Sequence, residues 1–131
     1  MKKLVLTLAL LLTTILTFGQ SIQYLRAKSF QLGYKVENSD IEWDKSSLSD
    51  CDILIKLGES EFTVYSKTPQ KYQVIRFDGK MKNGASRWYC SNSDGKTCNV
   101  YLMPPQGEST YPSLVIEFSD MVWFYVCKIV D

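Results

Sequence analysis

Apolar and polar residues alternate with a period of two along most of the chain after its first twenty residues. Between residues 30 and 36, every second position is apolar or aromatic: Phe30, Leu32, Tyr34 and Val36. Such alternation is typical of a β-strand with two different faces, and it recurs at 41–44, 51–55, 62–64 and 114–118. No stretch has the i, i+3, i+4 spacing of an amphipathic helix, and only residues 45–49 fit one helical turn. The chain is therefore expected to be all-β.

Short turn signals separate the predicted strands. Glycine, proline, asparagine, aspartate and serine residues mark the boundaries, at 58–60, 68–69, 78–79, 83–84 and 119–120. They leave about eight or nine short strands in sequence, the pattern of an antiparallel meander. A meander avoids exposed strand edges by closing into a barrel or by folding into two packed sheets. We expect an up-and-down barrel of the lipocalin or streptavidin type, with a β-sandwich as the alternative.

The first nineteen residues are organised like a secretory signal peptide. Lys2 and Lys3 precede an uncharged run over residues 4–16, and Thr17 and Gly19 are small residues before a cut that leaves Gln20 first. The alternative is a transmembrane anchor, which needs roughly 20 apolar residues, more than this run provides. We predict a signal peptide over 1–19 and a single all-β domain over 20–131. The protein is then exported, to the periplasm or the extracellular space, with no membrane span after cleavage.

The charge of the chain is close to neutral. The formal net charge is +1, and loss of Lys2 and Lys3 with the signal lowers it to −1. Nucleic-acid binding depends on a basic footprint, and binding to an anionic membrane surface depends on clustered basic residues. Neither of these partners is expected.

Four cysteines in an exported chain predict two disulfides, because the destination is oxidising. Residues 90–98 resemble a hairpin tip, in which Gly95 supplies the positive φ that such a loop needs. With a three-residue loop, Cys90 and Cys98 lie directly opposite each other, within bridging range. A two-residue turn would instead place Cys90 opposite Asn99.

The second predicted bridge follows by elimination and joins Cys51 to Cys127. Closing so long a loop stabilises a fold by about 4–4.5 kcal/mol in the chain-entropy model, against roughly 2.5 kcal/mol for the hairpin bridge. The alternative is that Cys51 and Cys127 are two buried free thiols.

The composition argues against an enzyme. The chain has no histidine, which excludes Ser-His and Cys-His nucleophiles and histidine-ligated metals, and thiols held in disulfides are not nucleophiles. Composition leaves a Ser-Lys dyad open but marks no particular pair. The grouped acidic residues are typical of a solvated strand face and lack the glycine and the closing glutamate of a calcium loop: Asp40, Glu42, Asp44, Asp50 and Asp52. We predict no catalytic residue, no metal site and no cofactor.

Two kinds of binding remain as hypotheses. The first is a small apolar ligand carried inside the barrel, with Trp88, Trp123 and Tyr125 as candidate wall residues. The second is an envelope protein bound by the loops 80–87 and 104–112, where Arg87 and Tyr111 are the candidate contacts. The alternative for the aromatic residues is that they simply fill the core of a small domain.

Two resemblances accompany these patterns. The segments 51–55 (CDILI) and 63–67 (TVYSK), with Gln70 and Tyr72, resemble small exported proteins of unknown function from Gram-negative bacteria, as does the Phe-Gly-Gln end of the signal. Residues 84–89 (GASRWY) are similar to the Ser-Gly-x-x-Tyr loop of periplasmic C-type lysozyme inhibitors, although Asn83 replaces the serine and Tyr89 is displaced.

The second resemblance implies an inhibitor of a hydrolase such as lysozyme. Taken together, the sequence predicts an exported, non-catalytic binding or interaction module of unknown ligand. A small-ligand carrier and a hydrolase inhibitor are the alternative functions.

Overall fold

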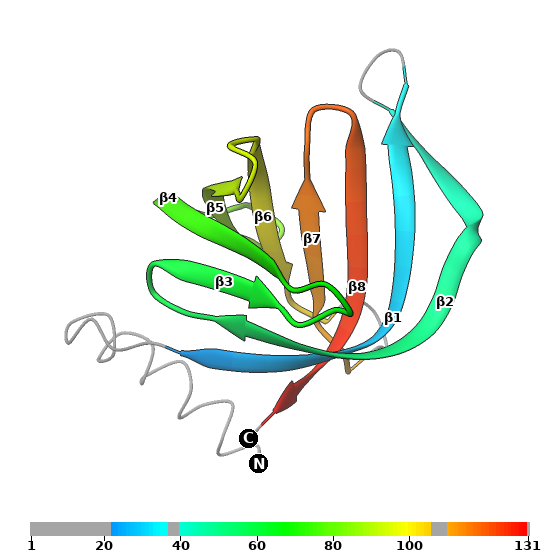
Figure 1. The fold of residues 1–131 in the computed structure, drawn as a ribbon, viewed down its shortest axis with the longest axis horizontal. Helices are drawn as coiled ribbons and strands as arrows, with labels where there is room; N and C mark the ends of the chain where they lie inside the picture. Colours follow the sequence, from blue (N-terminus) through cyan, green and yellow to red (C-terminus); the bar gives the residue numbers. More distant parts are fainter. Residues whose placement is uncertain (1–21, 37–39, 106–109, 131) are drawn as a thin grey trace.

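The computed structural model describes residues 22–36, 40–105 and 110–130, which form a closed antiparallel β-barrel (Figure 1). Each strand pairs with the next one in sequence, and β8 pairs with β1 to close the wall. The strands are β1 (Gln23–Lys35), β2 (Ile41–Leu57), β3 (Glu61–Val64), β4 (Gln70–Lys80), β5 (Ser86–Asn92), β6 (Thr97–Met103), β7 (Ser113–Glu117) and β8 (Met121–Val130). The preferred prediction of an eight-stranded up-and-down barrel is confirmed, and the β-sandwich alternative is wrong.

The predicted signal peptide lies outside the described residues. In the part of the chain that the structure does describe, no helix has the length and apolarity needed to cross a bilayer.

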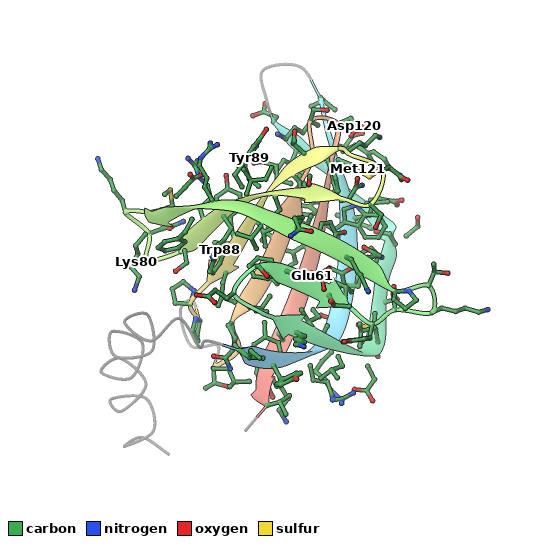
Figure 2. All side chains as sticks on the ribbon, turned by 60° about the vertical axis from the view of Figure 1, so that its left-hand side comes forward. Glu61, Lys80, Trp88, Tyr89, Asp120 and Met121 are labelled. Carbon is green, nitrogen blue, oxygen red and sulfur yellow. The ribbon has the colours of Figure 1, made fainter. Side chains whose placement is uncertain are left out.

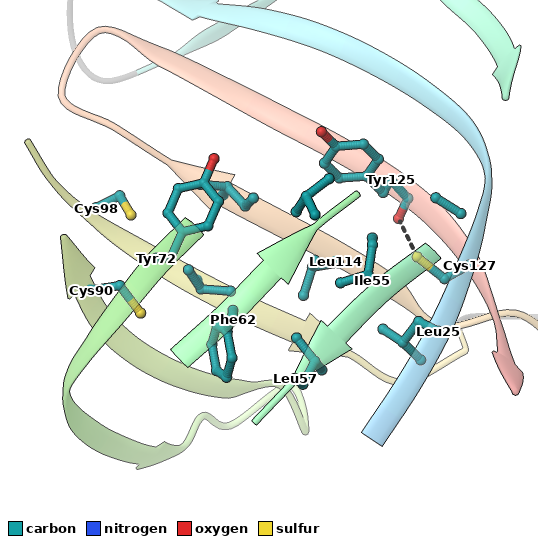
Figure 3. Packing of buried hydrophobic residues seen from close by; sticks show 14 of the residues in the cluster. Leu25, Ile55, Leu57, Phe62, Tyr72, Cys90, Cys98, Leu114, Tyr125 and Cys127 are labelled. Carbon is teal, nitrogen blue, oxygen red and sulfur yellow. Dashed lines mark hydrogen bonds between the residues drawn. The ribbon is translucent and has the colours of Figure 1, made fainter. Parts of the chain in front are cut away.

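Apolar side chains from all eight strands fill the barrel (Figure 3). In β8, every second side chain faces the interior: Tyr125 and Cys127 are buried in the core, and Trp123 packs against the core from the same face. Their partners across the wall face the same way, as with Leu114 beside Tyr125. The fully enclosed side chains are mostly aliphatic, as expected for a small barrel whose interior is packed rather than hollow: Leu25, Ile55, Val64, Val100, Leu114 and Ile116.

Alternate connections of a meander lie at the same end of the barrel. We call the mouth the end that contains the β3–β4, β5–β6 and β7–β8 connections, residues 65–69, 93–96 and 118–120. The β2–β3, β4–β5 and β6–β7 connections lie at the opposite end, where β8 also finishes (Figure 1). The mouth therefore gathers three hairpin turns around one end of the core.

The β5–β6 hairpin has the three-residue loop that the sequence predicts. The Asn92 N–H donates to the Lys96 carbonyl (2.8 Å), and the Gly95 N–H donates to the Asn92 carbonyl (3.0 Å). Gly95 has φ of +85°, a conformation that strains other residues. The Asn92 Oδ1 accepts from the N–H groups of Asp94 and Lys96 and so fixes the turn. Cys90 and Cys98 are consequently Cα partners, which confirms the predicted register.

Candidate binding site at the mouth of the barrel

A hollow of about 360 Å³ opens at the mouth. It lies where the three mouth connections approach one another, above the side chains that cap the core. Its lining combines an apolar floor with a polar rim, and consists of Pro69, Gln70, Lys71, Tyr72, Asn92, Ser93, Asp94, Lys96, Phe118, Asp120, Met121 and Trp123.

Tyr72 forms a rigid side of the floor. Its ring is 3% exposed, and its hydroxyl donates to Gln70 Oε1 (2.7 Å), while the Gln70 amide donates to Ser66 Oγ (3.3 Å). Burial raises the pKa of Tyr72 far above its ordinary value, so the side chain is a neutral phenol at all physiological pH values. Two hydrogen bonds in series therefore hold this wall in place.

The β7–β8 turn supplies the opposite side of the floor. The Phe118 N–H donates to the Met121 carbonyl (2.8 Å), which closes the turn and holds both side chains over the core. Trp123 follows on the same face of β8 and packs its ring against Phe30 with centroids 5.3 Å apart. This side of the hollow is apolar and backed by core residues.

Four charged side chains stand on the rim, two lysines and two aspartates: Lys71, Lys96, Asp94 and Asp120. All four are exposed. Within the described residues none of their side chains makes a hydrogen bond or ion pair, unlike the paired charges on the outer wall. The rim therefore offers charges of both signs to a ligand.

The three predicted wall residues occupy different places. Trp123 lines the hollow. Tyr125 lies one layer deeper, 2% exposed, with its ring 5.2 Å from Phe30. Trp88 lies toward the end that carries Lys80, away from Asp120 and Met121 (Figure 2), and packs edge-on against Phe62 at 5.2 Å. One of the three residues is thus placed to touch a ligand in the hollow, and the other two serve the core.

Sequence reasoning missed Tyr72, Phe118 and Met121. A signal for them was present, because the turn residues at 68–69, 93–95 and 119–120 belong to alternate connections of a meander and must share one end. The lining residues flank those turns.

Arg87 belongs to the barrel wall, as the second residue of β5, rather than to the β4–β5 connection. It lies in β5, and its guanidinium donates to Asp78 Oδ2 (3.3 Å). Asp78 also accepts from Arg76 (2.7 Å), whose guanidinium lies 4.4 Å from the centre of the Tyr89 ring. The nearby Tyr101 hydroxyl, and then the charge of Asp78, raise the pKa of Arg87. Tyr111 is 44% exposed, in the segment that precedes β7.

A second carboxylate continues this outer-wall network. Glu117 Oε1 accepts from the Tyr101 hydroxyl (3.1 Å) and from the Asn99 amide (3.4 Å), and Lys35 Nζ lies 3.0 Å from Glu117 Oε2. The network therefore ties β4, β5, β6, β7 and β1 together on the outside of the barrel.

All four cysteines are free thiols in the structure, so neither predicted disulfide is present. Cys127 pairs with Ala27 of β1, and Cys51 lies on the other side of β1 with its Sγ 3.5 Å from the Ala27 carbonyl. Two strand spacings, about 10 Å, separate β2 from β8, beyond the roughly 7 Å between Cα atoms that a disulfide tolerates. The structure therefore does not bring Cys51 and Cys127 within disulfide distance.

Cys90 and Cys98 are in a different situation. They face each other, but the Asn92–Lys96 hydrogen bond two residues away puts them in a hydrogen-bonded pair, in which Cβ atoms are about 5.5 Å apart. A disulfide needs about 3.5–4.5 Å. The two strands must approach each other locally before this bond can form.

Burial makes the facing thiols poor nucleophiles at neutral pH. It raises the pKa of Cys90 to about 12 and that of Cys98 to about 11. Among the described residues, no group of three histidine, cysteine, aspartate or glutamate side chains is arranged to hold a metal ion.

Comparisons with protein-family models, with curated proteins and with solved structures found no match to this chain.

Proposed function

We propose that this protein is an exported, non-catalytic binding protein that holds a small, partly apolar ligand at the mouth of its barrel. The observation that carries the proposal is the hollow of about 360 Å³. Ligand sites typically measure about 300–1,000 Å³ and combine apolar walls with a few polar groups. The size of the hollow favours a ligand with one or two rings rather than a long acyl chain.

The lining supports this proposal because its floor is rigid and the charged side chains of its rim are unpaired within the described residues. Tyr72 is fixed by its hydrogen bond to Gln70, and Trp123 is backed by Phe30. Such preorganised aromatic contacts lose little entropy when a ligand binds. The side chains of Lys96 and Asp120 make no hydrogen bond or ion pair within the described residues, so they are free to pair with polar groups of the ligand.

Export is part of this proposal. An exported domain meets an oxidising compartment, where facing cysteines are normally bridged. The hydrolase-inhibitor alternative receives no support from Arg87, because its guanidinium is already engaged by Asp78.

The test compares the mature wild-type protein, purified from an exporting host, with two tryptophan variants. Trp123→Ala removes an aromatic wall of the hollow, whereas Trp43→Ala removes a tryptophan from the outer wall and serves as the matched control. Native mass spectrometry detects a retained ligand, and titration with the dye anilinonaphthalenesulfonate measures saturable binding. Circular dichroism confirms that both variants fold.

We expect a discrete ligand mass or saturable dye binding for the wild type. Trp123→Ala should weaken dye binding about tenfold, because a large aromatic contact contributes roughly 1.5 kcal/mol, and Trp43→Ala should bind like the wild type. A wild type with neither adduct nor saturable dye binding would contradict the proposal. Equal effects of the two substitutions would also contradict it.

A further inference from the structure

Cys90 and Cys98 are the one pair of cysteines that the barrel places directly opposite each other. They are Cα partners on β5 and β6, and both side chains are buried among the core residues (Figure 3). Cα atoms of a hydrogen-bonded antiparallel pair are about 5.5 Å apart, inside the 4.4–6.8 Å range of disulfides. Only the side chains and the local strand spacing need to adjust for a bond to form.

The other two cysteines provide a contrast within the same molecule. Cys51 and Cys127 lie on opposite sides of β1, with the Ala27 backbone between them. A bond between them would require one strand of the closed wall to leave its place. Oxidation of the folded barrel should therefore join one pair and leave the other as thiols.

The Cys90–Cys98 pair also stands at the base of the turn that forms one side of the hollow. Residues 92–96, which lie between the two cysteines, contribute Asn92, Ser93, Asp94 and Lys96 to the lining. Tyr72 pairs with Asn92 across β4 and β5 and lies beside both thiols (Figure 3). A covalent bond at this position would limit the motion of that side of the hollow.

We propose that Cys90 and Cys98 are an oxidation site that forms the single disulfide of the mature protein, and that this bond holds the β5–β6 turn in the position that ligand binding requires. The second part rests on the proposed function, whereas the first does not. The bond restricts the turn residues to fewer conformations in the unliganded protein, so less entropy is lost when the hollow is filled.

Oxidised glutathione can serve as the oxidant. The thiolate of one cysteine attacks a sulfur of oxidised glutathione, forms a mixed disulfide and releases one glutathione thiolate. The second cysteine thiolate then attacks the protein sulfur of the mixed disulfide and releases the second glutathione. Two protons are given up by the protein thiols, and the two electrons end on the two glutathione molecules. Because both thiols are buried, the exchange takes place before the hairpin is packed or when it opens locally.

The test begins with a count of thiols. The mature protein is refolded with oxidised glutathione, alkylated in denaturant, digested with trypsin and analysed by mass spectrometry. Trypsin cleaves after Arg87, Lys96 and Lys128, so the expected bond joins peptide 88–96 to peptide 97–128. Because Cys98 and Cys127 both lie in peptide 97–128, fragmentation of the linked peptides must place the bond on Cys98 and the alkyl group on Cys127. Cys51 and Cys127 should be alkylated. Cys51→Ser should retain the bond, and Cys90→Ser should lose it. Alkylation of all four cysteines, or a bond that involves Cys51 or Cys127, would overturn the proposed disulfide.

The second measurement compares oxidised and reduced protein. Reduction of the wild type should lower Tm by about 5–10 °C, from the chain entropy of a nine-residue loop. It should also weaken binding of anilinonaphthalenesulfonate about fivefold or more, whereas reduction of Cys90→Ser should change neither quantity. A disulfide that forms without changing dye binding would overturn its role at the hollow and leave the proposed function standing. A disulfide in a protein that binds no dye in either state would instead contradict the proposed function.

Discussion

Gly33 lies on the outer wall of the barrel, where the aliphatic Ile41 and the aromatic Trp43 cover it. It pairs with Trp43 on β2 and with Val122 on β8. A Cβ atom at this position would stand 2.7 Å from Ile41 Cγ2 and 2.8 Å from Trp43 Cε3. Both distances are well below ordinary van der Waals contact, and neither atom is the end of a flexible chain. The substitution Gly33→Ala must therefore displace Ile41 and Trp43.

The expected cost can be worked out from these contacts. Overpacking of this kind costs about 1–3 kcal/mol. Displacement of Trp43 also disturbs its edge-on contact with Phe124, at 5.7 Å between ring centroids, and such a contact contributes about 0.5–1.5 kcal/mol. Alanine also lowers the conformational entropy of the unfolded chain, which stabilises the folded protein by about 0.4–1 kcal/mol and offsets part of this cost. We expect Gly33→Ala to lower the free energy of unfolding by about 1–3 kcal/mol.

Urea unfolding followed by far-ultraviolet circular dichroism measures this change without relying on tryptophan emission. The control is the same substitution in a background that carries Ile41→Ala and Trp43→Ala, which removes the three atoms nearest to the added methyl group. There Gly33→Ala should be neutral or stabilising by up to about 1 kcal/mol. If Gly33→Ala leaves the stability of the wild-type background unchanged, or lowers the stability of both backgrounds equally, then these side chains do not cover Gly33.

Two further predictions concern the core. Leu114→Ala, at a fully buried position, should lower the free energy of unfolding by about 2–5 kcal/mol in a urea titration with an unchanged m-value; a loss below 1 kcal/mol would contradict close packing at this site. The reduced protein should lose stability as pH rises above about 9, because the thiols of the unfolded chain then ionise while burial keeps the pKa of Cys90 at about 12 and that of Cys98 at about 11. Each thiol contributes a loss of up to about 1.4 kcal/mol per pH unit. Urea midpoints at pH 8, 9 and 10 should therefore fall more steeply for the reduced protein than for protein with a Cys90–Cys98 disulfide. Equal slopes for the two forms would refute the burial of these thiols.

Local features of the sequence determined the strands and one complete hairpin. The alternation over residues 30–36 and 114–118 predicted strands because the side-chain period of a strand is a property of the extended backbone itself. The turn at residues 93–95 fixed the Cys90–Cys98 register because loop length and the positive φ of Gly95 leave one way to pair the arms. Both depend on residues that are close in the chain.

Tertiary pairing decided what the mouth contains and which cysteines can meet. Trp88 and Trp123 both point toward the barrel interior, yet only Trp123 lines the hollow, because their levels along the barrel depend on the register of strands joined through the whole wall. Cys51 and Cys127 are separated because β1, near one end of the chain, pairs with β8, near the other. Closure between segments about a hundred residues apart depends on the combined packing of eight strands, and no local pattern encodes it.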